Sequence, residues 1–314
     1  MTAARGSVRS RISRQLAGIT VRPATGIAPV DRYGVRVARQ LLSYALQVLC
    51  PPLRGTLVEQ VRKAAVRGEW VRGPKATRTD AVIFYIHGGG FFAGSPRTHR
   101  GVTSRLSTAT RLPVFSVSYR LAPEHRFPAA PDDVANGYRW LIEQGYSPNR
   151  IVIAGDSAGG FLAMDLVIEN ARNDAPQPAA VVLISPMNDL SLAIAEERER
   201  TRRDAFISVM RARALVELYT DGSADPRLEL RPVRGMALPP TLIQVGDAEF
   251  LTADSIDLAD RLDSAGAHCE LQVWPDQMHV FHALAALVPE SRSAYRAAAQ
   301  FITTNLDPAD TIAV

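Results

Sequence analysis

Short apolar runs alternate with longer amphipathic segments from about residue 80 to the end of the chain. Most runs are almost continuously apolar, which is typical of strands buried on both faces of a parallel sheet. The segments between them carry apolar residues at helical spacing, and turn signals such as Ser147-Pro148-Asn149 and Gly266 separate helix from strand. The predicted strands are Ala81–Ile86, Pro113–Tyr119, Ile151–Ala154, Ala179–Ser185, Thr241–Val245 and Cys269–Trp274.

Helices are expected between these strands and after the last one. This strand–helix alternation predicts a doubly wound α/β sheet with helices on both faces. Two earlier strands, near Thr56–Arg62 and Gly68–Arg72, are expected to extend the sheet in antiparallel fashion. The predicted helices are Thr98–Thr110, Ala130–Gln144, Ala158–Arg172, Thr252–Ala265 and Glu290–Asn305.

Two regions break the alternation. Residues 1–50 look helical, and Val35–Leu49 has apolar positions at helical spacing. Residues 187–235 form a long charged insertion between two strands, a feature that is uncommon unless it is functional. Its densest charged run, Glu196–Arg200, is interpreted as a solvated helix face. We expect the insertion and the N-terminal helices to pack together as a cap.

Composition adds few constraints. The 314 residues are 46% apolar and 22% charged, as in ordinary globular proteins, and suffice for one α/β domain with an accessory part. The two cysteines, Cys50 and Cys269, form neither a disulfide framework nor a zinc signature. A reducing cytoplasm is therefore the simplest location, and no metal site is expected.

The basic excess is uneven, although the net charge is only +4. A positive N-terminal arm could contact anionic lipid or nucleic acid, but a solvated helical segment is the favoured interpretation. No nucleic-acid partner is expected, because no basic patch interleaved with aromatic residues occurs. The stretch Leu41–Pro52 is too short and interrupted for stable membrane insertion, and no signal-peptide pattern is present. The arginines of this N-terminal arm are Arg5, Arg9, Arg11, Arg14, Arg22, Arg32, Arg36 and Arg39.

The sequence Gly-Asp-Ser-Ala-Gly at 155–159 fits the pattern G-x-S-x-G. It follows the buried run Ile151–Ala154 and opens a helix near Ala158, as a nucleophile elbow does. Such a tight turn strains the central residue and projects its side chain above the sheet, and it requires glycine on both sides. A serine that merely caps a helix would not need these glycines. Ser157 is therefore the predicted nucleophile.

A serine hydroxyl needs a base, and in this elbow arrangement the chain order is serine, acid, histidine, each at the carboxyl end of a strand. His268 precedes the last strand, whereas His279 and His282 follow it. His282 is assigned to the next helix, so His279 is the predicted base. The acid should follow Thr241–Val245, where geometry alone leaves two carboxylates open, those of Asp247 and Glu249.

The sequence His-Gly-Gly-Gly at 87–90 follows the first strand of the alternation. The backbone N–H groups of Gly88 and Gly89 are predicted to form an oxyanion hole with that of Ala158. A phosphate-binding loop would instead need a helix directly after the glycines and a lysine partner. The residues that follow, Phe91 and Phe92, suit an acyl pocket better, and His87 is interpreted as a structural anchor of the loop.

With the sequence Tyr-Arg-Leu-Ala-Pro-Glu-His at 119–125, these motifs make the chain resemble the hormone-sensitive-lipase-like esterases, the bacterial type-IV branch of the α/β-hydrolases. The resemblance covers about Thr56 to Phe301. It implies a mostly parallel sheet flanked by helices, a helical cap, and a bracing role for 119–125 beside the oxyanion loop. The family's Asp-Pro-Leu aligns on Leu251, which puts Glu249 at the acid position. This chain departs from the family, because it has Glu249 in place of the usual aspartate and Phe250 in place of the proline, so Asp247 remains the alternative.

The resemblance further implies a serine carboxylesterase for short- to medium-chain acyl esters, with a triad of Ser157, Glu249 and His279 and without metal or organic cofactor. Residues 56–186 and 236–314 are the expected catalytic domain, and 1–55 and 187–235 the expected cap. The expected partner is a small acyl ester, and a homodimer is left open. Three alternatives remain: an amidase or acyltransferase with the same triad, a lipid-surface protein that acts through its basic N-terminus, and a non-catalytic small-molecule receptor. The gibberellin receptors, which resemble this family and lack the catalytic histidine, are of that last kind.

Overall fold

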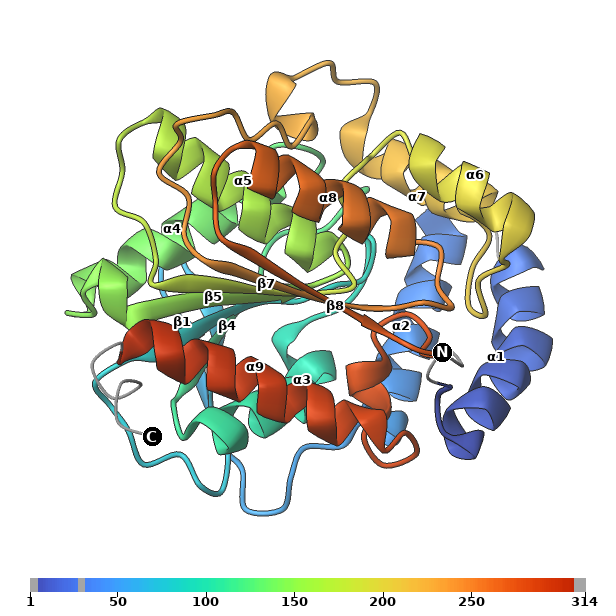
Figure 1. The fold of residues 1–314 in the computed structure, drawn as a ribbon, viewed down its shortest axis with the longest axis horizontal. Coiled ribbons are helices and arrows are strands. Elements are labelled where there is room, and N and C mark those ends of the chain that lie inside the picture. The colour runs from blue at the N-terminus through green and yellow to red at the C-terminus, as the bar shows by residue number, and fades with distance from the viewer. Residues whose placement is uncertain (1–4, 28–31, 308–314) are drawn as a thin grey trace.

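The computed structural model describes residues 5–27 and 32–307, and in this part of the chain one sheet has the strand order β1-β2-β4-β3-β5-β6-β7-β8 (Figure 1). β1 and β2 pair antiparallel, and β2 is antiparallel to β4, while the other neighbours are parallel. The predicted sheet and its antiparallel extension are confirmed. The strands are β1 Leu57–Arg62, β2 Arg67–Arg72, β3 Val82–Ile86, β4 Val114–Val117, β5 Ile151–Asp156, β6 Ala180–Ile184, β7 Thr241–Gly246 and β8 Cys269–Trp274.

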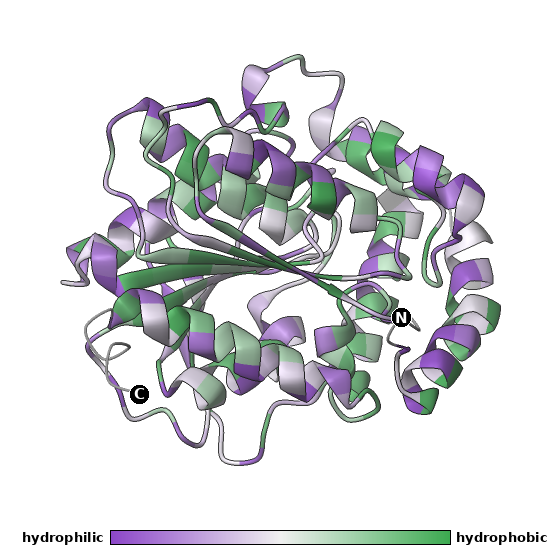
Figure 2. Ribbon diagram, in the orientation of Figure 1, coloured by the Kyte–Doolittle hydropathy of each residue, from purple (hydrophilic) through white to green (hydrophobic). Residues whose placement is uncertain are grey.

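The central strands are apolar because helices cover both of their faces, as the green centre of Figure 2 shows. Successive side chains of β3 point to opposite faces of the sheet and pack in two separate hydrophobic cores. Phe84 belongs to the core beneath α4, α5 and α8, whereas Ile83 and Tyr85 belong to the core beneath α3 and α9 (Figure 1). Each fully buried Ile or Phe side chain contributes about 1.5–3 kcal/mol. These helices are α3 Pro96–Thr110, α4 Ala129–Glu143, α5 Ala158–Arg172, α8 Thr252–Ser264 and α9 Glu290–Leu306.

Helix α3 begins two residues earlier than the apolar pattern predicts. Ser95 caps it, with Ser95 Oγ accepting from the N–H of Thr98 and Thr98 Oγ1 accepting from the N–H of Ser95. Pro96 occupies the first helical position, where its missing N–H costs nothing. Short 3₁₀ helices lie at Pro148–Arg150, Pro226–Leu228 and Phe281–Leu284.

Four further helices gather at one end of the sheet: α1 Val8–Ile27, α2 Arg32–Leu49, α6 Ala193–Thr201 and α7 Val209–Thr220 (Figure 1). The N-terminal segment contacts the 187–235 insertion directly. Arg22 forms an ion pair with Glu199 at 2.6 Å, and Thr25 Oγ1 donates to the carbonyl of Phe206 at 2.6 Å. None of the described helices combines the length and apolarity that a bilayer crossing needs.

Candidate active site

Ser157 stands at the junction of β5 and α5 with φ 52° and ψ −120°. Its positive φ is strained for a residue with a side chain, and the surrounding packing must hold it. Gly155 and Gly159 have no space for a side chain, as the tight turn predicts. A Cβ on Gly159 would overlap the carbonyl oxygen of Ile86, and a Cβ on Gly155 would overlap the backbone of Gly159.

His279 follows β8 and lies between Ser157 and Glu249. Its Nε2 is 3.0 Å from Ser157 Oγ, and its Nδ1 is 2.5 Å from Glu249 Oε2. The parallel strands β5, β7 and β8 end at the same edge of the sheet, which brings the three side chains together. A hydroxyl, an imidazole and a carboxylate in this chain of contacts can transfer a proton from the hydroxyl to the imidazole.

The carboxylate of Glu249 is buried and fixed at both oxygens. While Oε2 faces His279, Oε1 accepts from Ser185 Oγ at 2.7 Å and from the N–H of Gly246 at 2.8 Å. Ser185 Oγ also accepts from the N–H of Val280, beside His279. Ser185 therefore links the acid to the histidine loop, a role that sequence reasoning missed.

The alternative acid and the alternative base, Asp247 and His282, have other hydrogen-bond partners. Asp247 Oδ1 accepts from the N–H of Asp276 at 2.7 Å and pairs with Arg202, so it does not reach the imidazole of His279. His282 is buried in a 3₁₀ helix, with its Nε2 2.9 Å from Gln244 Oε1.

The pKa of His279 is raised. Burial disfavours the charged imidazolium, but the carboxylates of Glu249, at Nδ1, and of Asp204 and Asp156 together outweigh that effect. Asp204 is buried in the 187–235 insertion, where Oδ1 accepts from the N–H of Phe206 and Oδ2 from that of Phe250. This second carboxyl near the imidazole was also missed from the sequence. Both carboxyls favour the imidazolium that forms when His279 takes a proton.

Gly88 does not suit the oxyanion role predicted for it, because its N–H already donates to Asp156 Oδ1 at 2.9 Å. Asp156 is buried, accepts from Tyr85 Oη at 2.7 Å and lies 3.4 Å from His99 Nε2. Burial alone would raise the pKa of Asp156, but His99 and these hydrogen bonds lower it to about 2. The first glycine of the loop is thus an anchor onto a buried carboxylate.

The next two glycines differ from Gly88. Gly89 and Gly90 line the same cavity as Ser157 and have φ values of 118° and 60°, in the region that favours glycine. Within the described residues, no hydrogen bond is found for the N–H groups of Gly89, Gly90 or Ala158. These three donors, two of them predicted from the sequence, are free to bind a negatively charged oxygen.

The segment 119–125 packs behind the glycine loop. Tyr119 Oη donates to the carbonyl of His87 at 2.7 Å, and the two rings stack with centroids 4.2 Å apart. The N–H of Ala122 donates to the carbonyl of Phe91 at 3.0 Å. These contacts agree with the bracing role expected of the segment and with that of His87 as an anchor.

A cavity of about 340 Å³ opens beside Ser157 and His279. Its walls are mostly apolar. Phe92 lines it, as expected for an acyl pocket, but Phe91 does not: its ring stacks on Tyr219 in the core, with centroids 4.0 Å apart. Other apolar lining residues include Leu42, Leu46, Leu49, Met187, Phe206, Ile207, Leu215 and Phe250.

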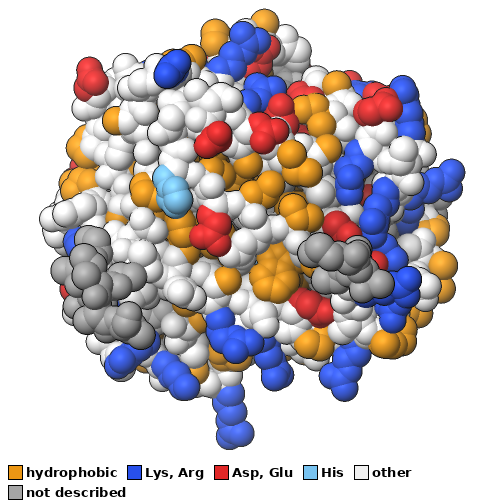
Figure 3. Space-filling view, in the orientation of Figure 1, with side chains coloured by type: hydrophobic (Ala, Val, Ile, Leu, Met, Phe, Trp, Pro, Cys, Tyr) orange, Lys and Arg blue, Asp and Glu red, His pale blue; other side chains and the backbone are white. Residues whose placement is uncertain are grey.

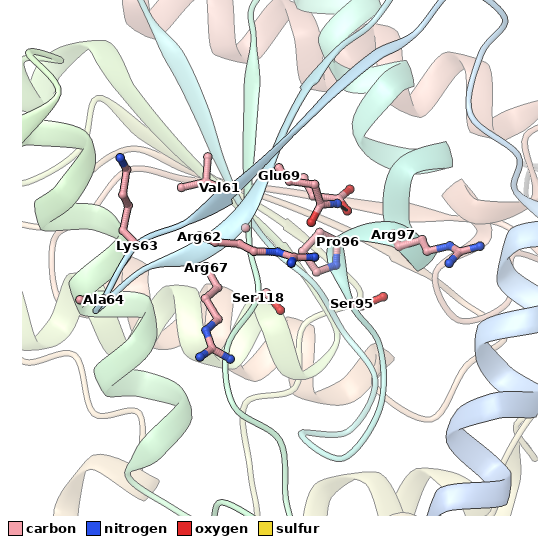
Figure 4. Close-up of a pocket in the computed structure, with 12 residues that line it drawn as sticks. Val61, Arg62, Lys63, Ala64, Arg67, Glu69, Ser95, Pro96, Arg97 and Ser118 are labelled. Atoms are coloured by element: carbon pink, nitrogen blue, oxygen red, sulfur yellow. Dashed lines mark hydrogen bonds between the residues drawn. The ribbon is translucent and has the colours of Figure 1, made fainter.

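A larger hollow of about 660 Å³ lies away from this site, between the β1–β2 hairpin and the start of α3 (Figure 4). Its one carboxylate, Glu69, is paired with Arg100 at 2.7 Å. Figure 4 shows the cationic ends of Lys63 and Arg97 pointing to opposite sides. The hollow therefore offers neither a nucleophile–base pair nor a converging set of charges. No cluster of metal-binding side chains occurs within residues 5–27 and 32–307.

Comparison with known proteins gives a consistent result. A family model described as the alpha/beta hydrolase fold matches residues 83–283. An acetyl-hydrolase of Streptomyces hygroscopicus is 38% identical over 75% of this chain and 79% of its own length. The carboxylesterase/phospholipase LipF of Mycobacterium tuberculosis is 35% identical over 80% of this chain and 70% of its own. A crystal structure of an esterase from the bacterial hormone-sensitive lipase family superposes with a TM-score of 0.86 at 31% identity, covering 96% of this chain and 100% of that chain.

Proposed function

Since this chain belongs to the hormone-sensitive-lipase-like esterases of the α/β-hydrolase fold, we propose that it is a serine carboxylesterase for short- to medium-chain acyl esters. The observation that carries the proposal is the contact sequence Ser157 Oγ, His279 and Glu249 at the mouth of an apolar cavity. Relatives named esterase, carboxylesterase and acetyl-hydrolase support the reaction class.

In the proposed cycle, His279 Nε2 takes the proton of Ser157 Oγ as that oxygen attacks the ester carbonyl. The alcohol then leaves with this proton, and the acyl group stays on the serine. Water, deprotonated by the same imidazole, releases the carboxylic acid. Glu249 holds the imidazole in one tautomer and stabilises the imidazolium in both steps.

The negative charge of the tetrahedral intermediate falls on the N–H groups of Gly89, Gly90 and Ala158 in this proposal. This set of donors includes Gly90 instead of Gly88, because the N–H of Gly88 already donates to Asp156. Each such donor is typically worth about 10²–10³ in turnover, because it is already oriented before charge develops.

The cavity supports the substrate class. Its volume of about 340 Å³ is near the lower end of small-molecule sites, and its walls present mainly side chains without hydrogen-bonding groups. Short and medium acyl chains fit such a space. We propose that residues 1–55 and 187–235 form the cap over a catalytic domain of residues 56–186 and 236–314, since helices α1, α2 and α7 line this cavity.

Ser157→Ala tests the proposal. We expect turnover of p-nitrophenyl butyrate to fall by about 10⁴–10⁶, because the hydroxyl is the proposed nucleophile. The far-ultraviolet circular dichroism and the melting temperature should stay close to those of the unsubstituted protein. Esterase activity that persists in a folded Ser157→Ala protein would refute the assignment.

Two of the alternatives separate in simple assays. A receptor without a working base should not react with a fluorophosphonate probe, whereas we expect rapid labelling because His279 contacts Ser157. An amidase or acyltransferase would prefer anilides over matched esters, or an added alcohol over water as acyl acceptor. We expect hydrolysis of the ester to dominate both comparisons.

A further inference from the structure

Exposed apolar side chains are concentrated on the two N-terminal helices. Among the described residues, eighteen large hydrophobic side chains are exposed, and eleven of them belong to α1 and α2. Scattered exposure of this kind is normal on a protein surface, but concentration on two consecutive helices is not. The ester-hydrolysing site gives no reason for an apolar outer surface on these helices.

Eight of the eleven follow the helical repeat: Val8, Ile12, Leu16 and Ile19 in α1, and Val37, Leu41, Tyr44 and Val48 in α2. The other three are Val21, Tyr33 and Leu49, of which Val21 and Leu49 line the cavity. Successive members lie three or four residues apart, so each set forms one continuous stripe on its helix. The eight side chains are between 50% and 72% exposed. We call these two sets the outer stripes.

Other sides of the same helices face the proposed substrate site. Val21 and Thr25 of α1 and Leu42, Leu46 and Leu49 of α2 line the cavity that contains Ser157. One pair of helices thus carries apolar residues both toward the cavity and toward the solvent. A helix that merely covers a core would present polar residues on its outer side.

The charges that α1 and α2 themselves carry are of one sign. The first fifty residues contain eight arginines and a single acid, Asp31. Within the described residues, Arg5, Arg9, Arg11 and Arg36 take part in no ion pair. In Figure 3, blue basic and orange hydrophobic side chains lie next to one another along the right-hand edge, over α1. Apolar stripes flanked by unpaired arginines are typical of helices that lie in a membrane interface.

We propose that the outer stripes of α1 and α2 dock the protein on the surface of an anionic lipid bilayer. The apolar side chains enter the boundary between headgroups and acyl chains, and the arginines bind lipid phosphates. Docking is peripheral. It places the cap against the lipid, so that an ester dissolved in the bilayer can reach the cavity between these helices and the sheet. This last consequence rests on the proposed function, whereas the binding itself does not.

A second copy of the chain fits the outer stripes less well than a bilayer does. A symmetric dimer through this face would bring each stripe and its arginines against the same kind of surface. The unpaired arginines would then face arginines, and the two helices offer no acid among their described residues to compensate. Anionic headgroups supply the missing charge.

Vesicle flotation tests the proposal, with the Ser157→Ala protein so that no lipid is hydrolysed. We expect binding to vesicles that contain phosphatidylglycerol and little binding to pure phosphatidylcholine vesicles. High salt should release the protein. Ile19→Gln combined with Leu41→Gln should weaken binding at least roughly tenfold by removing inserted apolar surface. Arg9→Gln combined with Arg36→Gln should weaken it roughly fivefold for each charge removed.

Matched variants control for general effects. Leu57→Gln with Val233→Gln removes exposed apolar side chains away from these helices, and Arg54→Gln with Arg234→Gln removes exposed charges. These pairs should leave vesicle binding within about twofold. Hydrolysis of a water-soluble acetyl ester by the same substitutions on the Ser157 background reports on the proposed function separately.

Three outcomes would overturn the proposal: no binding to anionic vesicles, equal binding to both kinds of vesicle, or equal loss in the stripe and control variants. Sedimentation velocity adds a further check. If the protein is a dimer that Ile19→Gln with Leu41→Gln dissociates, and vesicle binding is absent, the outer stripes are an interface between copies of this chain.

Discussion

At the scale of single residues, the position of the proposed triad acid depends on what holds the second oxygen of its carboxylate. Glu249 reaches His279 with Oε2 only because Ser185 and Gly246 hold Oε1 on the other side. Asp247, two residues earlier, is drawn to Arg202 and the N–H of Asp276 instead. The choice between the two acids is therefore made by partners that lie on other strands and loops.

The raised pKa of His279 predicts the pH dependence of the reaction. The base must be neutral to take the proton of Ser157, so activity is lost as pH falls through the pKa of His279. Since Glu249 raises that pKa, the acidic limb of kcat/KM should lie above about 6.5, the ordinary value of imidazole. A pH profile of ester hydrolysis measures it.

Glu249→Gln should move that limb to lower pH and reduce kcat by about 10³–10⁴, because the imidazolium loses its counter-charge. Asp247→Asn is the matched control and should leave the position of the limb unchanged. If Asp247→Asn moves the acidic limb and Glu249→Gln does not, Asp247 and not Glu249 is the acid that acts on His279.

The sequence predicted Ser157 from its motif between a strand and a helix, His279 from its place after the last strand, and the glycine loop from its run of three glycines. It missed Ser185 and Asp204, which are single polar residues without a motif, and it assigned Gly88 the wrong partner. The last error has a physical cause: the side chain of Asp156 turns back beneath the loop and takes the N–H of Gly88. No spacing rule indicates where a side chain in the middle of a motif will point.

At the scale of helices and strands, the sequence pattern located the eight strands of the sheet and the five α-helices that cover it, but not the short 3₁₀ helices. The ends were less well placed. Predicted strand Pro113–Tyr119 shortens to Val114–Val117, because Tyr119 leaves the sheet to contact the glycine loop. An apolar run measures burial, and burial continues beyond the last residue that pairs with a neighbouring strand.

Helix α8 contains a buried acid that should limit stability. Asp254 lies in the first turn, and within the described residues its Oδ2 has no hydrogen-bond partner. Burial raises its pKa to about 7. The folded protein thus holds this proton more tightly than the unfolded chain, so the free energy of unfolding falls as pH rises from about 4 to about 7.

Asp254→Asn removes that loss, since an amide keeps the acceptor for the N–H of Asp189 and carries no charge. We expect a higher melting temperature than that of the unsubstituted protein at about pH 8, and a smaller difference at about pH 5.5. Differential scanning calorimetry at the two pH values measures both. Asp260→Asn, at an exposed site of the same helix, is the control. A lower melting temperature for Asp254→Asn at both pH values would contradict the proposed effect of the buried charge.

At the scale of the whole molecule, three distant parts of the chain meet around one cavity. The N-terminal helices, the 187–235 insertion and the loops after the strands all contribute lining residues. The contacts of Arg22 with Glu199 and of Arg39 with the carbonyls of Phe92 and Ala122 connect these parts. The sequence indicated that the first two parts would pack together, but not which side chains would face the cavity.

Filling the cavity from α7 should change chain-length preference. Ala212 lines the cavity, so Ala212→Phe should lower kcat/KM for octanoyl esters about tenfold or more, and for acetyl esters only slightly. Met210→Phe, at an exposed position of the same helix, should have little effect. Kinetics on a series of p-nitrophenyl esters measures the change. Equal losses for acetyl and octanoyl esters would show that this wall does not contact the acyl chain.

The placement of α1 and α2 also bears on how such genes are recognised. Every motif that identifies the chemistry lies downstream of residue 80, yet Leu42, Leu46 and Leu49 come from the first fifty residues. A shortened polypeptide that starts at residue 51 would pass any motif search for an ester hydrolase. It would nevertheless open the reaction centre to bulk water on the side of α1 and α2, and it would lose the part of the apolar wall that these helices supply to hold an acyl chain.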